Sequence, residues 1–157
     1  PNKKVVNRKT NEKRELSYFQ SLLGKYISEH HPELSNDKAF LSSRADEALN
    51  VYANAITIGL SDLEAEEAAN EILYNGLHFS KYDTIVEVLW NEFAENIPQS
   101  LAERLAAILL GNTAIQKTFA KYKLDDDFDG KPEYDELYTE LTGCIQIIIE
   151  RNELPVF

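Results

Sequence analysis

The sequence is poor in the features that stabilise small secreted domains or anchor a chain in a membrane. It has one cysteine, Cys144, in 157 residues, so no internal disulfide can form, and no zinc-binding spacing surrounds it. Its longest uninterrupted apolar run, residues 105–110, is far shorter than the ~20 residues of a membrane-spanning helix. The polar, basic N-terminus has no apolar core and does not resemble a signal peptide. These absences predict a cytoplasmic protein without a membrane partner.

The sequence also lacks the short motifs that accompany common catalytic chemistry. It contains neither the GxSxG turn of serine hydrolases nor a glycine-rich phosphate loop. Its histidines do not follow the HExxH pattern or another metal-binding spacing, and they are His30, His31 and His78. No cofactor is therefore expected. An enzyme is not favoured, although an enzyme with an unrecognised site stays open as an alternative.

Positive charge is scarce outside the first fourteen residues. The formal net charge is −11, yet residues 1–14 carry six basic groups and one acid, a local charge of +5. The remaining chain therefore carries −16, and such a surface repels nucleic-acid phosphates, which bind lysine and arginine. We expect contact with nucleic acid at most weakly, through residues 1–14. This segment lacks apolar periodicity, so we interpret it as a basic flexible tail.

The rest of the chain has the apolar periodicity of α-helices. A length of 157 residues suits one domain, and 43% hydrophobic residues suffice for a core. Apolar residues recur at three- and four-residue steps in seven segments, while no hairpin turn lies between alternating residues. Ser61 with Glu64 forms a capping-box pattern, Ser80 suits a helix start, and Pro132 suits a first turn. We predict an all-α fold over 15–157, a single domain of about seven helices around one core, without a β-sheet.

The fourth predicted helix, starting at Ser80 and ending at Pro98, has the widest apolar face. Its apolar set covers an arc of about 140°, wider than the ~100° of a surface helix. The set consists of Tyr82, Ile85, Val86, Leu89, Trp90, Phe93 and Ile97. We therefore expect this helix at the centre of the domain, with Trp90 largely buried.

Three stretches carry a resemblance to a known family: GLHFSKYDT at 76–84, LWNEF at 89–93 and PEYDELYTELTG at 132–143. With them, the chain resembles an uncharacterised family of small helical proteins from Bacteroidetes-type bacteria, a domain of unknown function. Members are often encoded with conjugative or mobile genetic elements. The resemblance covers roughly residues 15–152 and implies an all-α fold and a bacterial cytoplasmic protein. It implies no activity, so no functional residue carries over.

The sharpest chemical pattern lies in the acidic loop before the last helix. Asp125, Asp127, Asp129, Gly130 and Glu136 fit D-x-D-x-D-G-x5-E, the calcium loop of an EF-hand. Alternate aspartates and a glutamate at the twelfth position supply the hard oxygens that Ca²⁺ prefers. Pro132 opposes this interpretation because it cannot donate a backbone hydrogen bond at the eighth position, and no second loop is present. The alternative is an acid-rich helix N-terminus, which the helix dipole favours.

Taken together, the sequence favours a non-enzymatic accessory protein that binds another protein, with homo-oligomerisation left open. This interpretation rests mainly on elimination, because no catalytic motif was found. The alternative function is a calcium-binding module at 125–136, with Asp125, Asp127, Asp129 and Glu136 as the metal ligands.

Overall fold

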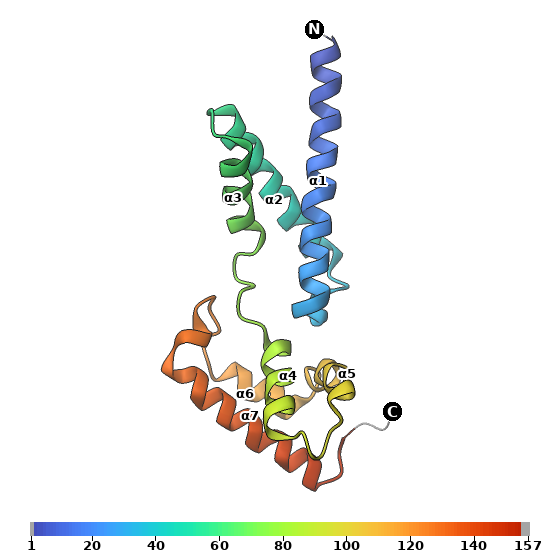
Figure 1. The fold of residues 1–157 in the computed structure, drawn as a ribbon, viewed down its shortest axis with the longest axis vertical. Coiled ribbons are helices and arrows are strands. Elements are labelled where there is room, and N and C mark those ends of the chain that lie inside the picture. The colour runs from blue at the N-terminus through green and yellow to red at the C-terminus, as the bar shows by residue number, and fades with distance from the viewer. Residues whose placement is uncertain (1, 155–157) are drawn as a thin grey trace. The chain divides into compact units, whose positions relative to one another are not determined.

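The fold is all-α (Figure 1). A computed structural model describes residues 2–154, and it describes side chains from residue 13 onward. No strand occurs in these residues, and the prediction of an all-α fold with about seven helices is confirmed. The helices are α1 (Asn2–His30), α2 (Lys38–Thr57), α3 (Asp62–Leu73), α4 (Lys81–Glu92), α5 (Gln99–Leu109), α6 (Thr113–Ala120) and α7 (Pro132–Glu150). Two short 3₁₀ helices, η1 (Pro32–Leu34) and η2 (Phe128–Gly130), lie between them.

The chain divides into two compact units. Unit 1 consists of residues 1–29 and 34–75, and unit 2 of residues 30–33 and 76–157. Each unit has its own set of buried apolar side chains. The sequence predicted one core and not a division into two units. Helical periodicity shows which face of a helix is buried, but it does not show which other helix covers that face.

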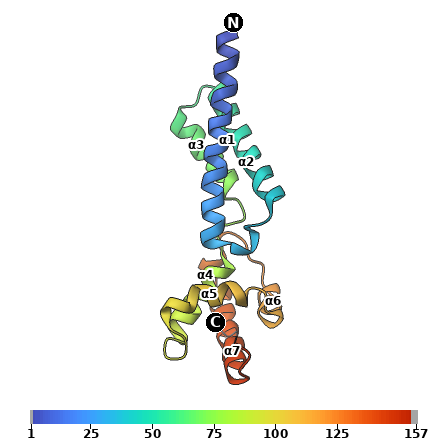
Figure 2. The ribbon, with the colours of Figure 1, turned by 90° about the vertical axis from the view of Figure 1, so that its right-hand side faces the viewer.

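Unit 1 is built on α1 and the antiparallel helix pair α2–α3, which Figure 2 shows beside one another. Alanines on both members of the pair, among them Ala45, Ala48, Ala65 and Ala69, are fully buried. Small side chains let two helix backbones approach closely, and the larger side chains of α1 then complete the core. These larger residues are Phe19, Leu23 and Ile27.

The predicted boundary between a tail and the first helix at residue 15 is not present. The helix α1 begins at Asn2, so residues 2–14 continue the same helix that packs further along. Lysine, arginine and glutamate are good helix formers, and extending an existing helix adds one hydrogen bond for each residue fixed. Missing apolar periodicity therefore did not indicate a missing helix. The side chains of 1–12 lie outside the described residues, and flexibility of this segment stays a prediction.

In unit 1, Arg44 closes the C-terminal end of α3. Its Nη1 lies 2.6 Å from the Asn75 carbonyl oxygen and 3.3 Å from those of Ile72 and Leu73. The last carbonyls of a helix lack partners within the helix, so a cationic donor stabilises them. The Arg44 guanidinium also lies over the Phe40 ring, 5.0 Å from its centroid.

Unit 2 packs α4, α5, α6 and α7 around one apolar cluster. Its fully buried members come from all parts of the unit and include Ile85, Val88, Ile115, Leu137, Leu141 and Ile145. The caps expected from the sequence are present, since Ser80 caps α4 and Pro132 occupies the first turn of α7. In unit 1, the capping box of Ser61 and Glu64 is likewise formed.

The expectation that Trp90 is largely buried is wrong, since its side chain is 41% exposed. The buried face of α4 instead includes Thr84 and Val88, which rotates the buried arc away from Trp90. Trp90 thus lies at the edge of the apolar face. The helix also ends at Glu92, before Pro98, and the turn that follows keeps Phe93 and Ile97 buried without helical geometry.

Candidate functional site

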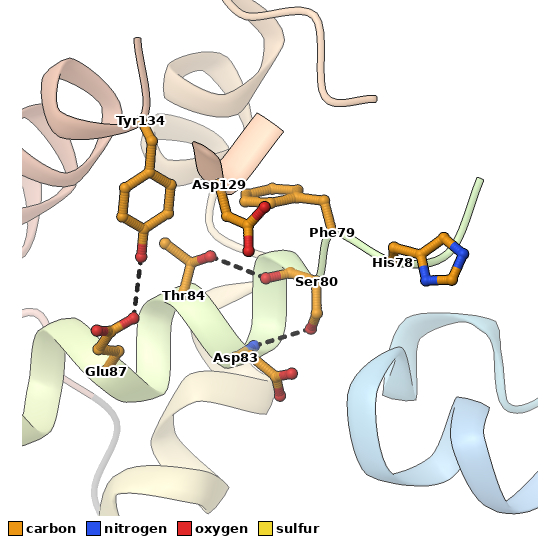
Figure 3. A pocket seen from close by; sticks show the side chains of 8 residues that line it. All are labelled: His78, Phe79, Ser80, Asp83, Thr84, Glu87, Asp129 and Tyr134. Atoms are coloured by element: carbon orange, nitrogen blue, oxygen red, sulfur yellow. Dashed lines mark hydrogen bonds between the residues drawn. The ribbon is translucent and has the colours of Figure 1, made fainter. Parts of the chain in front are cut away.

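Unit 2 contains a pocket of about 140 Å³ at the N-terminal end of α4 (Figure 3). Residues 78–80 and the first two turns of α4 form one side, while η2 and the start of α7 form the other. The lining residues are His78, Phe79, Ser80, Asp83, Thr84, Glu87, Asp129 and Tyr134.

The start of α4 is fixed by hydrogen bonds of its capping serine. The backbone N–H of Asp83 donates to Ser80 Oγ at 2.9 Å, and Thr84 Oγ1 donates to the Ser80 carbonyl at 2.9 Å. Ser80 Oγ in turn donates to the carbonyl oxygen of His30. Because Asp83 and Glu87 are four residues apart on this helix, both carboxylates lie on one face. The cap therefore positions two of the acids that line the pocket.

Three carboxylates line the pocket, and they have different partners. Glu87 accepts a hydrogen bond from the Tyr134 hydroxyl at 2.9 Å, and Asp83 lies 2.7 Å from His30 Nδ1. Within the described part of the chain, the Asp129 side chain makes no hydrogen bond or ion pair, and no lysine or arginine lines the pocket. Figure 3 shows Asp129 reaching the pocket from η2, across from α4. The pocket therefore holds more negative charge than its own groups neutralise.

Aromatic rings form one wall of the pocket. The Phe79 ring lies 5.1 Å from Phe128 and 6.4 Å from Tyr134, and both pairs meet edge to face. Phe128 is buried, so this wall is anchored in the core of unit 2. Burial, followed by the hydrogen bond to the Glu87 carboxylate, raises the pKa of the Tyr134 phenol well above its ordinary value. Tyr134 therefore stays protonated and donates to Glu87 at neutral pH.

The chemistry of the pocket suits binding of a cation better than covalent catalysis. Its serine hydroxyl caps α4 and donates to the His30 carbonyl, so this group already has a structural role in the helix start. Carboxylates around an aromatic wall attract a cation both by charge and through the ring faces. An ammonium or guanidinium group is the ligand class that this arrangement fits.

The acidic loop that matched a calcium site is arranged differently from an EF-hand. Lys131 Nζ lies 3.0 Å from Asp125 Oδ1 and 3.4 Å from Asp127 Oδ1, so an ammonium occupies the space between the two carboxylates. This hydrogen bond from Lys131 lowers the pKa of Asp125. Asp129 faces the pocket instead, and Glu136 is exposed on α7. The structure thus does not bring Asp125, Asp127, Asp129 and Glu136 to one centre.

Within the described residues, no group of three or more histidine, cysteine, aspartate or glutamate side chains could hold a metal ion. The three histidines serve other contacts. His30 pairs with Asp83, and His31 is buried with its Nε2 2.7 Å from the Leu77 carbonyl oxygen. His78 lines the pocket, with Nε2 4.0 Å from Asp126 Oδ2. Calcium binding was the alternative hypothesis and stays an untested prediction.

The residue of the acidic loop with the clearest structural role is Asp126, which the calcium pattern passes over. Its carboxylate accepts hydrogen bonds from the backbone N–H groups of Gly76, at 2.9 Å, and His78, at 3.1 Å. Gly76 has a φ of +78°, a conformation that favours glycine. Asp126 therefore fixes the backbone of residues 76–78, which leads into the pocket.

The pocket cannot be predicted from the sequence because its parts are far apart in the chain. Asp83 and Glu87 have a visible four-residue spacing on a predicted helix, and this is the only local signal. Asp129 and Tyr134 join them from more than forty positions away. Only their three-dimensional positions identify the set.

No helix in residues 2–154 combines the length and the apolar character needed to span a membrane.

Comparison with known proteins supports the predicted relationship. The model of the family DUF1896, a domain of unknown function, matches residues 11–154. The chain is similar to the crystal structure of protein PG0816 from Porphyromonas gingivalis, with 54% sequence identity and a TM-score of 0.91. That match covers 94% of this chain and 99% of the other. No curated protein matches the chain. The chain therefore belongs to the DUF1896 family, whose domain has no assigned function.

Proposed function

We propose that this chain is a non-enzymatic protein-interaction protein whose pocket in unit 2 takes up a cationic side chain of a protein partner. The observation that carries the proposal is the uncompensated charge of the pocket. Asp83, Glu87 and Asp129 line it together, and the Asp129 side chain has no hydrogen bond or ion pair to the described residues.

A lysine ammonium fits this charge pattern better than an arginine guanidinium. The ammonium is a compact charge with three donors on a flexible apolar stem, whereas the guanidinium presents a planar fork that suits one carboxylate. The pocket offers carboxylates on two opposite sides and the Phe79 and Tyr134 rings along the stem. A volume of about 140 Å³ accommodates the end of one such side chain.

The pocket is open to solvent, which limits the affinity of one side chain. The Asp83 side chain is 49% exposed, and exposed ion pairs contribute about 0–1 kcal/mol each. We therefore expect a dissociation constant on the order of 1–10 mM for an isolated lysine, equivalent to roughly 3–4 kcal/mol. A protein partner would add contacts around the pocket.

We place this activity in the bacterial cytoplasm, supported by the single cysteine and by the relationship to a bacterial protein. A link to mobile genetic elements belongs to the same proposal and rests on the family resemblance.

The experiment is a titration of the ¹⁵N-labelled chain, followed by NMR. The ligands are Nα-acetyl-lysine methylamide and its uncharged counterpart, Nα-acetyl-norleucine methylamide. We expect the lysine compound to shift the amides of residues 78–87 and 129–134 and to saturate at millimolar concentration. An arginine compound with its citrulline counterpart separates the two cationic groups, and tighter binding of arginine would contradict the choice of lysine.

Variants test the role of the carboxylate. Asp129→Asn removes the charge with little change of shape and is expected to weaken lysine binding about threefold to tenfold. Asp127→Asn is the matched control, since Asp127 lies two positions away and faces Lys131 instead of the pocket. Equal shifts with norleucine, or equal effects of the two variants, would refute the proposal.

A further inference from the structure

The turn between α2 and α3 exposes four large apolar side chains within eight residues. We call these residues, Ile56, Ile58, Leu60 and Leu63, the apolar tip. Ile58 is 77% exposed and Leu63 is 66% exposed. Single exposed apolar residues are ordinary, but four within eight residues of one turn indicate an interaction surface.

Backbone hydrogen bonds on both sides of the turn fix the conformation of the apolar tip. Gly59 has a φ of +98° and ends α2 in a Schellman motif, in which the Leu60 N–H bonds to the Ala55 carbonyl at 3.0 Å. The Gly59 N–H bonds to the Ile56 carbonyl at 3.1 Å, and the capping box of Ser61 starts α3 directly afterwards. The apolar side chains are thus held outward by an ordered turn.

The surroundings of the tip are acidic. The first turns of α3 carry acids immediately after the turn, at Asp62, Glu64, Glu66 and Glu67. No lysine or arginine occurs in the sequence between Arg44 and Lys81. An occupant that covers the tip must therefore combine apolar side chains with positive charge, because like charges at its rim would repel it.

The chain itself contains such a segment in the N-terminal half of α1. Residues 1–14 carry a charge of +5 and include two adjacent apolar residues, Val5 and Val6. The helix runs through this segment, and residues 2–14 span roughly 20 Å at 1.5 Å per residue.

The packing within unit 1 shows that this segment extends past the tip of its own chain. Tyr18 donates a hydrogen bond to Glu66, and the Tyr26 ring lies 4.8 Å from the Tyr74 ring. The two residues of each pair are 48 positions apart in the sequence, so α1 and α3 are parallel and keep a constant register. Residue 14 is then level with Asp62, where α3 begins. By the same register, residues 10–13 are level with 58–61, so residues 2–9 of the helix extend past the apolar tip of their own chain.

We propose that a second copy of this chain covers the apolar tip, each copy placing the basic N-terminal half of its α1 on the tip of the other. The two contacts are equivalent, as in the two-fold symmetric dimers that are the commonest homo-oligomers. The match lies in the sequence: residues 1–14 bring a charge of +5 and two adjacent apolar residues to a tip followed by acids in α3. The proposal is independent of the pocket, which lies in unit 2.

Sedimentation velocity of the full chain tests this dimer. We expect a mass of twice 17.9 kDa at about 50 mM salt and dissociation toward the monomer at about 500 mM, where exposed charges are strongly screened. The double substitution Ile58→Ser with Leu63→Ser is expected to raise the dimer dissociation constant at least tenfold. The double substitution Lys3→Glu with Lys4→Glu is expected to do the same.

The matched control is Ile147→Ser in α7, since Ile147 is also an exposed apolar residue but belongs to unit 2. It should leave the dimer unchanged, as should Asp129→Asn, which tests the pocket instead. Circular dichroism verifies that each variant keeps its helical content. A monomer at every salt and protein concentration overturns the proposal. A dimer that tolerates the tip substitutions, or that Ile147→Ser weakens equally, overturns it as well.

Discussion

Asp126 and Asp127 are neighbours in the acidic loop, yet the structure predicts opposite consequences for their removal. Asp126 accepts two backbone hydrogen bonds, from Gly76 and His78, whereas the Asp127 side chain is 78% exposed and, among the described residues, pairs with Lys131 alone. In Asp126→Ala the two N–H groups lose a charged acceptor. In Asp127→Ala an exposed ion pair is lost and the backbone keeps its partners.

The expected cost of Asp126→Ala follows from these bonds. A hydrogen bond to a charged group contributes about 1.5–3 kcal/mol, and two of them set an upper range of roughly 3–6 kcal/mol. The Asp126 side chain is 33% exposed, so water replaces part of what is lost. We therefore expect a loss of about 2 kcal/mol for Asp126→Ala and less than ~0.5 kcal/mol for Asp127→Ala.

Urea unfolding measures this difference. The single tryptophan, Trp90, lies on α4 of unit 2, so its fluorescence reports the unfolding of the unit that contains Asp126. Hydrogen exchange adds a local test, since the amides of Gly76 and His78 should lose protection in Asp126→Ala alone. Equal losses of stability in the two variants, or unchanged exchange at both amides, would show that Asp126 does not hold this segment.

Three further predictions concern other residues. Arg44→Ala should destabilise unit 1 by about 1–2 kcal/mol, because three carbonyl groups at the end of α3 lose their donor, and Arg44→Lys should recover only part of this in thermal unfolding. Burial lowers the pKa of His31, but hydrogen bonds to Glu33 and to the Leu77 carbonyl outweigh it and raise the pKa above 6.5. The stability from His31 should therefore be present below pH 6.5 and be lost as pH rises through the raised pKa; a His31→Gln chain with the same pH slope of unfolding would contradict this. Terbium luminescence sensitised by Tyr134 or Phe128 should be absent at micromolar terbium, because Lys131 holds Asp125 and Asp127; emission that calcium displaces and Glu136→Gln abolishes would support the calcium alternative.

Local signals in the sequence were sufficient to predict the starts of α3, α4 and α7. The capping box of Ser61, the cap at Ser80 and the proline at the start of α7 act within one helical turn, so a single sequence carries the whole pattern. Hydrophobic spacing supplied the rest of the all-α fold.

The sequence alone does not decide between competing partners of one side chain. The aspartates at 125 and 127 could accept an ion or a lysine, and Lys131 lies 3.0 Å and 3.4 Å from their carboxylates. Trp90 could be buried or exposed on a helix with a wide apolar face, and burial of Val88 decided the rotation. The pocket joins residues more than forty positions apart, and no spacing rule connects them.

The proposed function depends on a cation entering the acidic pocket. A crystal structure of the chain grown with Nα-acetyl-lysine methylamide, at several times its dissociation constant, tests this most directly. We predict electron density for the ammonium within about 2.7–3.2 Å of the Asp129 carboxylate, with the stem along Tyr134. An empty pocket under these conditions, or a lysine compound bound elsewhere on the chain, would contradict the proposal.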